Sequence, residues 1–472
     1  MSAILLVTIN AKWIHPSLAL RLLKANLGAL EEQCRIVEFI LRQPMEERIN
    51  VILAAQPQIL GISVSIWNHG ETLKLLKELH KAWETDGRAR PVIVLGGPEV
   101  SYLPPESEIF KFADHCIAGE GETAFRILCE GKQTQPGEAF PARSGYHLYT
   151  DEDLRRKLVY VEASRGCPYS CEFCLSAHSE KIREFPLEPF FSEMDTLIQR
   201  GARTFKFLDR SFNMNIKRAQ QIMEFFLERI EKHTDSLVVH FEMVPSRFPP
   251  DLIETIARFP LGTLRLEIGI QTLNPEAAAR ISRSSNPQQE LASIRLLREK
   301  TNAIIHADLI AGLPGEDMAS FGRGFDALYA ALSVPADEHA HNTLVEIQLG
   351  ILKLLPGAPI ARHTAAFGMC YNPEPPYEVM ETSVISRCDL DRLKHYARFW
   401  ELLVNRRLIT MGGSMVFDRF MALSDSLYAH FGRSWGIPKN ELIEAVMSLP
   451  PVLLELVSCE NARSRKCKNM AI

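Results

Sequence analysis

Three cysteines within eight residues constrain this chain more than any other feature of its sequence. Cys167, Cys171 and Cys174 directly follow the apolar run at 158–164 and a short Arg-Gly step. A tetrahedral zinc site or a cluster bound entirely by protein needs a fourth ligand, and the next cysteine is Cys370. The spacing indicates a [4Fe-4S] cluster with one iron left open, while a zinc site completed by His178 is the alternative.

Length and charge narrow the class of protein further. A chain of 472 residues predicts two or three domains, and its net charge of −5 does not indicate a nucleic-acid or anionic-membrane partner. Ten cysteines are too few for a disulfide scaffold and fit metal binding in a reducing compartment. The first residues lack a basic leader, and no apolar run is long enough to span a membrane. We therefore expect a cytoplasmic protein.

Strands and helices alternate over the first part of the chain. This alternation predicts a doubly wound parallel sheet, in which ligands bind where the strands end. Glycines follow the predicted strands at 96–97 and at 119–121, and glycine lets the backbone approach a bulky ligand closely. Such loops alone are weak evidence, because every α/β fold needs tight turns. The strands are expected at 4–9, 35–39, 59–65, 91–95 and 115–118.

A second series of strands and helices begins at residue 158. Residues 136–157 lose periodicity and are expected to be a linker, and six strands then alternate with helices up to about residue 360. Polar residues lie at or near the strand ends, and a buried carboxylate needs a partner, either a ligand or a barrel arginine such as Arg210, Arg247 or Arg265. These polar residues are Asp209, Glu242, Glu267 and Asp308.

The Cys-x3-Cys-x-Phe-Cys stretch resembles the signature of the radical S-adenosylmethionine (SAM) superfamily. In that family the open iron binds the methionyl part of SAM, and the reduced cluster cleaves SAM to methionine and a 5′-deoxyadenosyl radical. The resemblance implies a partial (β/α)6 TIM-type barrel over residues 158–360 and cluster ligands at Cys167, Cys171 and Cys174. Together with the polar strand ends, it implies SAM contacts at Phe173, Asp209, Glu242, Glu267, Gln271 and Ile310.

The glycine loops that precede the cysteines resemble those of the cobalamin-binding domain found at the N-terminus of cobalamin-dependent radical SAM enzymes. The resemblance implies a Rossmann-like cobalamin-binding domain over residues 1–135. The usual Asp-x-His-x-x-Gly motif is missing, so either His15 is the lower cobalt ligand or the cobalt has no protein ligand. The implied cobalamin contacts are Asn10, Trp13, His15, Ser63, Ser65, Trp67, Asn68, Gly96, Gly97, Glu99, Glu120, Gly121 and Glu122.

Residues 361–472 are expected to form a helical cap over the barrel mouth. One helix is predicted to begin at a capping Asp389 and to present an apolar stripe to the core, and a second helix is predicted around 439–448. The sequence indicates no role for Cys370 or Cys388.

The resemblance implies a cobalamin-dependent radical SAM enzyme, with a [4Fe-4S] cluster, SAM and cobalamin as cofactors. The expected reaction is methyl transfer to an unactivated carbon or phosphorus of an unknown substrate, with flavodoxin or ferredoxin as electron donor. One alternative is a cyclase or rearranging enzyme that uses the same cofactors without transferring a methyl group. The other is a non-catalytic iron-sulfur protein that senses a ligand.

Overall fold

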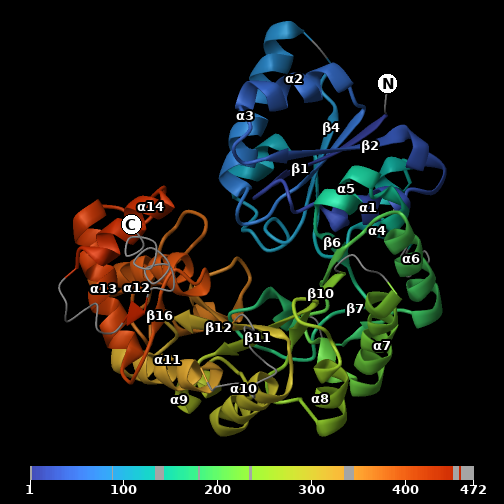
Figure 1. The fold of residues 1–472 in the computed structure, drawn as a ribbon. Coiled ribbons are helices and arrows are strands. Elements are labelled where there is room, and N and C mark those ends of the chain that lie inside the picture. The colour runs from blue at the N-terminus through green and yellow to red at the C-terminus, as the bar shows by residue number, and fades with distance from the viewer. Residues whose placement is uncertain are drawn as a thin grey trace, which may run out of the picture.

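The computed structural model contains two parallel sheets and a group of C-terminal helices (Figure 1). The structure describes residues 3–87, 89–132, 143–178, 181–232, 237–333, 345–449 and 457–458. In Figure 1 the N-terminal sheet lies above the central sheet, and the C-terminal helices lie beside the barrel. This arrangement confirms the predicted fold class.

The N-terminal sheet is doubly wound around its first strand. Its order is β2-β1-β3-β4-β5, and all neighbouring strands are parallel. Every residue of β1 is buried, as expected for a central strand covered by helices on both faces. The strand order reverses direction at β1, so the adjoining strand ends form a binding crevice. The elements are β1 (Ile4–Asn10), α1 (Leu18–Ala25), β2 (Cys34–Ile40), α2 (Met45–Ala55), β3 (Ile59–Ser63), α3 (His69–Asp86), β4 (Val92–Gly96), β5 (His115–Ile117) and α4 (Glu122–Cys129).

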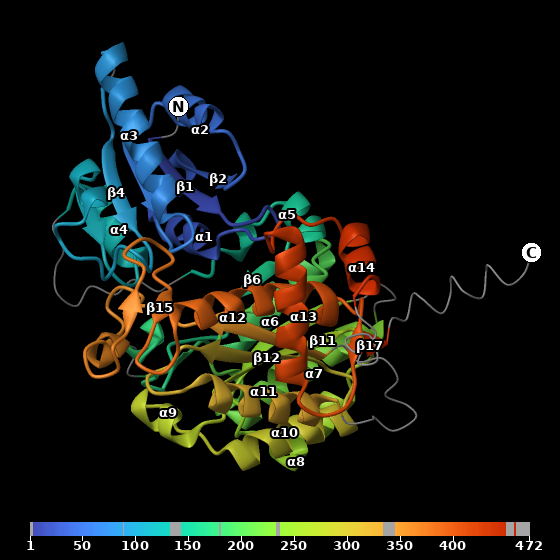
Figure 2. The ribbon, with the colours of Figure 1, turned by 90° about the vertical axis from the view of Figure 1, so that its left-hand side faces the viewer.

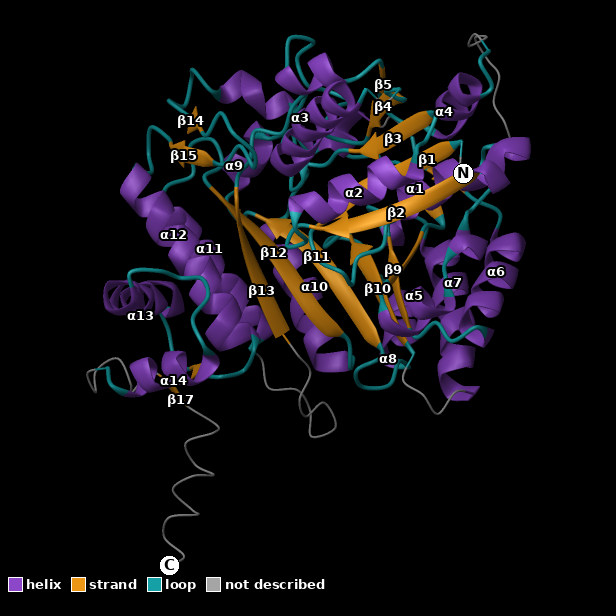
Figure 3. Ribbon diagram, turned by 90° about the horizontal axis from the view of Figure 1, so that it is seen from above, coloured by secondary structure: helices purple, strands orange, loops and turns teal. Residues whose placement is uncertain are grey.

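The central sheet is a partial barrel of six parallel strands in the order β13-β12-β11-β10-β9-β6. Alternate residues of each strand are buried in the core between the sheet and its helices, and the intervening residues are half-buried on the other face. Figure 3 shows the strands from above. The elements are β6 (Val159–Val161), α6 (Leu187–Gln199), β9 (Thr204–Phe207), α7 (Ile216–Lys232), β10 (Val238–Met243), α8 (Pro250–Ala257), β11 (Leu264–Gln271), α9 (Pro275–Arg280), α10 (Pro287–Lys300), β12 (Ile304–Ala311), α11 (Met318–Leu332) and β13 (Val345–Ile351).

The expected linker has regular structure in its second half. Residues 133–142 lie outside the described residues, but helix α5 (Asp151–Arg156) follows them and begins with a capping box formed by Thr150 and Asp153. The buried guanidinium of Arg21, on α1, lies 2.8 Å from the Asp153 carboxylate and 3.0 Å from that of Glu38. Segment 143–157 is therefore fastened to the N-terminal sheet. A helix of six residues is too short to show a periodicity in sequence.

The C-terminal region is mainly helical, as expected, but one helix begins elsewhere and one was not predicted. Helix α12 (Arg387–Trp400) is capped by Ser386, whose hydroxyl accepts a hydrogen bond from the Asp389 amide, so the expected cap at Asp389 is wrong. Helix α13 (Val416–Phe431) was not predicted, and α14 (Lys439–Met447) was. A hairpin of β14 (Cys370–Tyr371) and β15 (Val379–Glu381) approaches the N-terminal domain, as Figure 2 shows. No helix in the described part of the chain is long and apolar enough to cross a membrane.

Candidate functional site

The three cysteines of the motif line one cavity at the mouth of the barrel, which we call the cluster cavity. It has a volume of about 220 Å³, and Glu242, Glu267, Gln271 and Asp308 also line it. The loop that carries the cysteines leaves β6 through Gly166, whose φ is +103°. A Cβ at Gly166 would lie 2.3 Å from the carbonyl oxygen of Lys181, so this close turn requires glycine.

The donor set of the cluster cavity, three cysteine sulfurs, fits an iron-sulfur cluster. Among the described residues, no group of three His, Cys, Asp or Glu side chains is arranged to hold one metal ion. In an iron-sulfur cluster each thiolate binds a different iron, so the sulfurs need not converge on one point. The His178 side chain, the fourth ligand of the zinc alternative, lies outside the described residues.

Two residues that were not predicted hold the cysteine loop in place. Glu172 is buried, and its carboxylate accepts hydrogen bonds from the Arg362 guanidinium (2.6 and 2.8 Å), the His363 ring (2.9 Å) and the Ser282 hydroxyl (2.5 Å). Arg283 lies 3.8 Å from the sulfur of Cys171 and donates to the carbonyl of Gly269. The motif itself contains Glu172, but its partners are more than 100 residues away in sequence, and no local pattern predicts such pairs.

The predicted SAM contacts divide into three groups. Phe173, Glu242, Glu267 and Gln271 line the cluster cavity. Ile310 lines a different cavity, described below. Asp209 lines neither of them: its buried carboxylate accepts hydrogen bonds from the Ala163 amide (3.0 Å) and the Ser164 hydroxyl (2.6 Å). The Asp209 carboxylate therefore fixes the end of β6, and its contact with SAM stays a prediction.

The carboxylates of the cluster cavity differ in ionisation. Burial raises the pKa of Glu242, although Arg210 lies 3.4 Å away. Burial opposes ionisation of Glu267 as well, but its contacts with His240 (3.1 Å) and Lys206 (3.0 Å) outweigh burial and lower its pKa to about 2. Burial, and to a smaller extent the negative charge of Glu267, raise the pKa of Asp308 to about 7. Its Oδ1 atom is buried and has no hydrogen-bond partner among the described residues.

A second cavity, the interdomain cavity, lies between the N-terminal strand ends and the cysteine loop. It has a volume of about 820 Å³, and its walls come from both domains, including Phe125 on one side and Leu208 and Leu355 on the other. Most of the predicted cobalamin contacts line it. These are Ser63, Ser65, Trp67, Gly96, Gly97, Glu99, Glu120, Gly121 and Glu122.

The other predicted cobalamin contacts are not among the residues that line the interdomain cavity. Asn10 donates to Glu38, and Asn68 donates to the Ile9 carbonyl. Trp13 is 44% exposed, and the amine of Lys157 lies 5.0 Å from its ring centre. His15 bonds through Nδ1 to the hydroxyl of Tyr160 at 2.7 Å. This contact holds the His15 ring against β6, and its role as a cobalt ligand stays a prediction.

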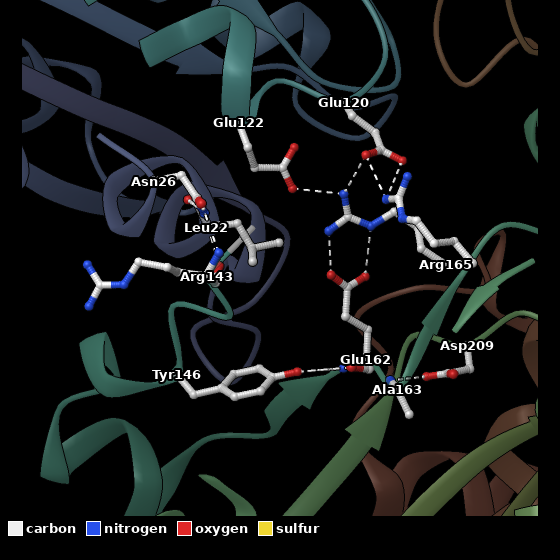
Figure 4. Close-up of polar contacts among 11 residues, drawn as sticks. Leu22, Asn26, Glu120, Glu122, Arg143, Tyr146, Glu162, Ala163, Arg165 and Asp209 are labelled. Atoms are coloured by element: carbon white, nitrogen blue, oxygen red, sulfur yellow. Dashed lines mark hydrogen bonds and ion pairs between the residues drawn. The ribbon is translucent and has the colours of Figure 1, made fainter. Parts of the chain in front are cut away.

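The predicted acidic contacts are held by partners from the cysteine loop and the C-terminal hairpin. Arg165 lies 2.8 Å from Glu122 and 3.1 Å from Glu120, and it also binds Glu162 on its own loop (Figure 4). Glu99 is buried and accepts a hydrogen bond from the Tyr377 hydroxyl at 2.6 Å. The acids thus fix the two domains and the C-terminal hairpin around the interdomain cavity.

The glycine loops leave space that a large planar ligand could fill. A Cβ added at Gly96 would meet only the carbonyl of Ile117, at 3.7 Å, and one at Gly119 would meet no atom within 4 Å. At Gly97, by contrast, a Cβ would lie 2.5 Å from the Val64 carbonyl, and φ is +107°. The open, largely apolar crevice at the strand ends fits a corrin, which needs close backbone approach.

Comparison with family models identifies both domains. The B12 binding domain model matches residues 4–129, and the radical SAM superfamily model matches residues 161–326. The first implies cobalamin, and the second implies a [4Fe-4S] cluster and SAM. The chain thus joins a B12 binding domain to a radical SAM domain, which confirms the predicted family and cofactors.

Similar proteins include a curated methyltransferase and two solved structures with a similar fold. The 2-(S-pantetheinyl)-carbapenam-3-carboxylate methyltransferase of Streptantibioticus cattleyicolor is 24% identical over 359 residues, which cover 64% of this chain and 48% of the relative. The chain spans about half the length of the curated relatives it matches. The radical SAM methyltransferase TsrM from Kitasatospora setae has a TM-score of 0.58 at 18% identity, covering 82% of this chain and 80% of TsrM. The cobalamin-dependent SAM radical enzyme OxsB, with aqua-cobalamin and SAM bound, has a TM-score of 0.64 at 13% identity, covering 99% of this chain and 81% of OxsB.

Proposed function

We propose that this chain is a cobalamin-dependent radical SAM methyltransferase that acts on an unactivated carbon or phosphorus centre. The observation that carries the proposal is the position of Phe173, whose side chain lines both the cluster cavity and the interdomain cavity. Cys174, Ser176 and Arg210 also line both cavities. Radical methyl transfer needs SAM, cobalamin and substrate within reach of one another, and two adjoining cofactor cavities meet that need.

The residues of the chain position the cofactors and exclude water. When bound, the cluster and SAM supply a radical that abstracts hydrogen, and cobalamin supplies the methyl group. Cys167, Cys171 and Cys174 would hold the cluster and leave one iron open. Glu172 holds their loop, and Arg165 fixes the loop against the B12 binding domain.

Asp308 is the residue of the cluster cavity that best fits a donor group of SAM. Its Oδ1 pairs with His306 at 3.6 Å but has no hydrogen-bond partner among the described residues, so it would accept a hydrogen bond from the ammonium or a ribose hydroxyl of SAM. Because its pKa is about 7, the carboxylate is ionised above that pH and protonated below it. His306, 3.6 Å away, has a pKa raised to about 9 and stays charged across this range.

SAM affinity should therefore rise with pH through about 7. Below the pKa we expect the dissociation constant to increase by up to about tenfold per pH unit. Asp308→Asn should abolish this dependence and bind SAM at all pH values as weakly as the parent protein does at low pH. Equilibrium dialysis of each cluster-loaded protein measures SAM affinity as a function of pH. An unchanged pH profile in Asp308→Asn would contradict the assignment of Asp308 as a SAM contact.

Cobalamin retention can be tested without disturbing the core. Gly96→Leu places its side chain in the interdomain cavity at a position whose φ is not in the left-handed region. We expect cobalamin affinity to fall by roughly tenfold or more through overpacking, with the iron content unchanged. Gly70→Leu is the matched control, since Gly70 also has open space around it but lies outside the cavity. Visible absorbance measures the cobalamin that each variant retains. Equal retention in the two variants would show that cobalamin binds elsewhere.

The reaction itself is tested by anaerobic reconstitution with cobalamin, a reductant and methyl-labelled SAM in an extract of the source cell. Transfer of label to a small molecule or macromolecule supports methyl transfer. Formation of 5′-deoxyadenosine without labelled product would favour the cyclase or rearrangement alternative. A cluster-loaded protein that never cleaves SAM would favour the alternative of a non-catalytic iron-sulfur protein that senses a ligand.

A further inference from the structure

A third cavity, which we call the C-terminal cavity, lies between β13 and the helices α12 and α13. Its volume is about 890 Å³. Phe173 lines this cavity as well as the two cofactor cavities, and Leu355 lines both this cavity and the interdomain cavity. A molecule bound here would therefore reach the point at which the proposed cofactor sites meet.

One part of the wall of the C-terminal cavity is apolar and belongs to the barrel. These side chains extend from the strands and the loop after β13, so they provide a rigid surface for a hydrocarbon segment. They are Ile310, Ile347, Leu349, Ile351, Leu352 and Leu355.

Another part of the wall carries a net positive charge, because four cations line it against the two carboxylates Glu378 and Glu401. The cations are Lys353, Lys394, Arg398 and Arg433. Lys353, Arg398 and Arg433 line the cavity, and none of them forms an ion pair with another described residue. Both carboxylates of the wall already have cationic partners: Glu378 lies 3.5 Å from Lys394, and Glu401 lies 3.1 Å from Arg406. The Nε atom of Arg398 is also buried and has no hydrogen-bond partner within the described part of the chain.

An aromatic ring holds one of these cations in place. The guanidinium carbon of Arg398 lies 4.0 Å from the ring centre of Trp435, and this indole is 68% exposed. Cation–π contact orients the guanidinium before any ligand arrives, which lowers the entropy cost of binding an anion. A large exposed tryptophan at the wall of a cavity is also typical of a ligand-binding surface.

We propose that the C-terminal cavity is the substrate site and that its ligand is an organic anion with an apolar segment and a carboxylate or phosphate group. The apolar segment contacts the barrel wall next to Phe173, which places carbon atoms at the junction of the cofactor cavities. The anionic group binds Arg398 and Arg433, because guanidinium groups form paired hydrogen bonds with either oxyanion. The assignment of this ligand as substrate rests on the proposed function.

Binding of simple probes tests the ligand chemistry without turnover. We would titrate the full-length, cluster-loaded protein with octanoate, octyl phosphate and neutral octanol by calorimetry under anaerobic conditions. The anions should bind about tenfold more tightly than octanol, and the stronger of the two identifies the preferred oxyanion. Arg398→Gln and Arg433→Gln should each weaken anion binding by about tenfold and leave octanol binding unchanged.

Arg387→Gln is the matched control, because Arg387 is an exposed arginine of the same helix α12 that does not line the cavity. It should leave all three affinities unchanged, and Arg398→Lys should retain part of the preference for anions. Equal affinity for octanol and the anions, or the same loss in Arg387→Gln, would overturn the proposal. Charge-dependent binding in a protein that transfers no methyl label would contradict the proposed function alone, because the probes report binding without chemistry.

Discussion

Cys171→Ala should abolish both cluster assembly and SAM cleavage. The three thiolates are the only cluster ligands that the motif supplies, and removing one would leave two irons without protein ligands. Cys171 is also buried, with the Arg283 guanidinium 3.8 Å from its sulfur, so no solvent ligand can easily replace it. We expect iron and sulfide content after anaerobic reconstitution to fall to a small fraction of the parent value. Formation of 5′-deoxyadenosine should fall to the level of a protein-free blank.

Cys388→Ala provides the control for this result. Cys388 is an exposed free cysteine in the C-terminal region and lines none of the three cavities. Its removal should change neither the iron content nor the rate of SAM cleavage. A normal cluster spectrum and normal SAM cleavage in Cys171→Ala would mean that the motif does not hold the cluster.

The sequence predicted the two sheets because their strands have strong local signals. Buried parallel strands are continuous apolar runs, such as β1, and polar residues interrupt the pattern at the strand ends. The same signals located the cysteine loop and the glycine loops, since Gly96 directly follows one such run and Cys167 follows another after an Arg-Gly step. Patterns of this kind need no knowledge of distant contacts.

The contacts that the sequence could not predict are those between residues distant in the chain. Asp209 follows a strand just as Glu267 lies in one, yet it bonds the Ala163 amide, whereas Glu267 lines the cluster cavity. His15 follows β1 in a loop suited to a ligand, but its Nδ1 atom is hydrogen-bonded to the hydroxyl of Tyr160, 145 residues away in sequence. Glu172 is fixed by Arg362 and His363, which come from beyond the last barrel strand. Only the folded chain brings these pairs together.

Arg21→Met should lower the free energy of unfolding by about 3 kcal/mol. Its side chain is 4% exposed and lies within 3.0 Å of both Glu38 and Asp153. Methionine fills a similar volume but removes the positive charge that neutralises the two buried carboxylates. Breaking a buried ion pair in this way costs about 3 kcal/mol. Asp153 retains Lys157 at 2.9 Å, which limits the loss. Urea unfolding of cofactor-free protein measures the change in the free energy of unfolding.

Arg156→Met tests whether burial is the cause. Arg156 lies on the same helix as Asp153 and pairs with Glu152 at 3.7 Å, but its side chain is 69% exposed. Surface pairs of this kind contribute less than about 1 kcal/mol, so its loss should be small. Because Arg21 joins the N-terminal sheet to the segment that leads into the barrel, Arg21→Met should also weaken cobalamin retention, while Arg156→Met should not. Equal losses in the two variants would show that the buried pair does not hold the domains together.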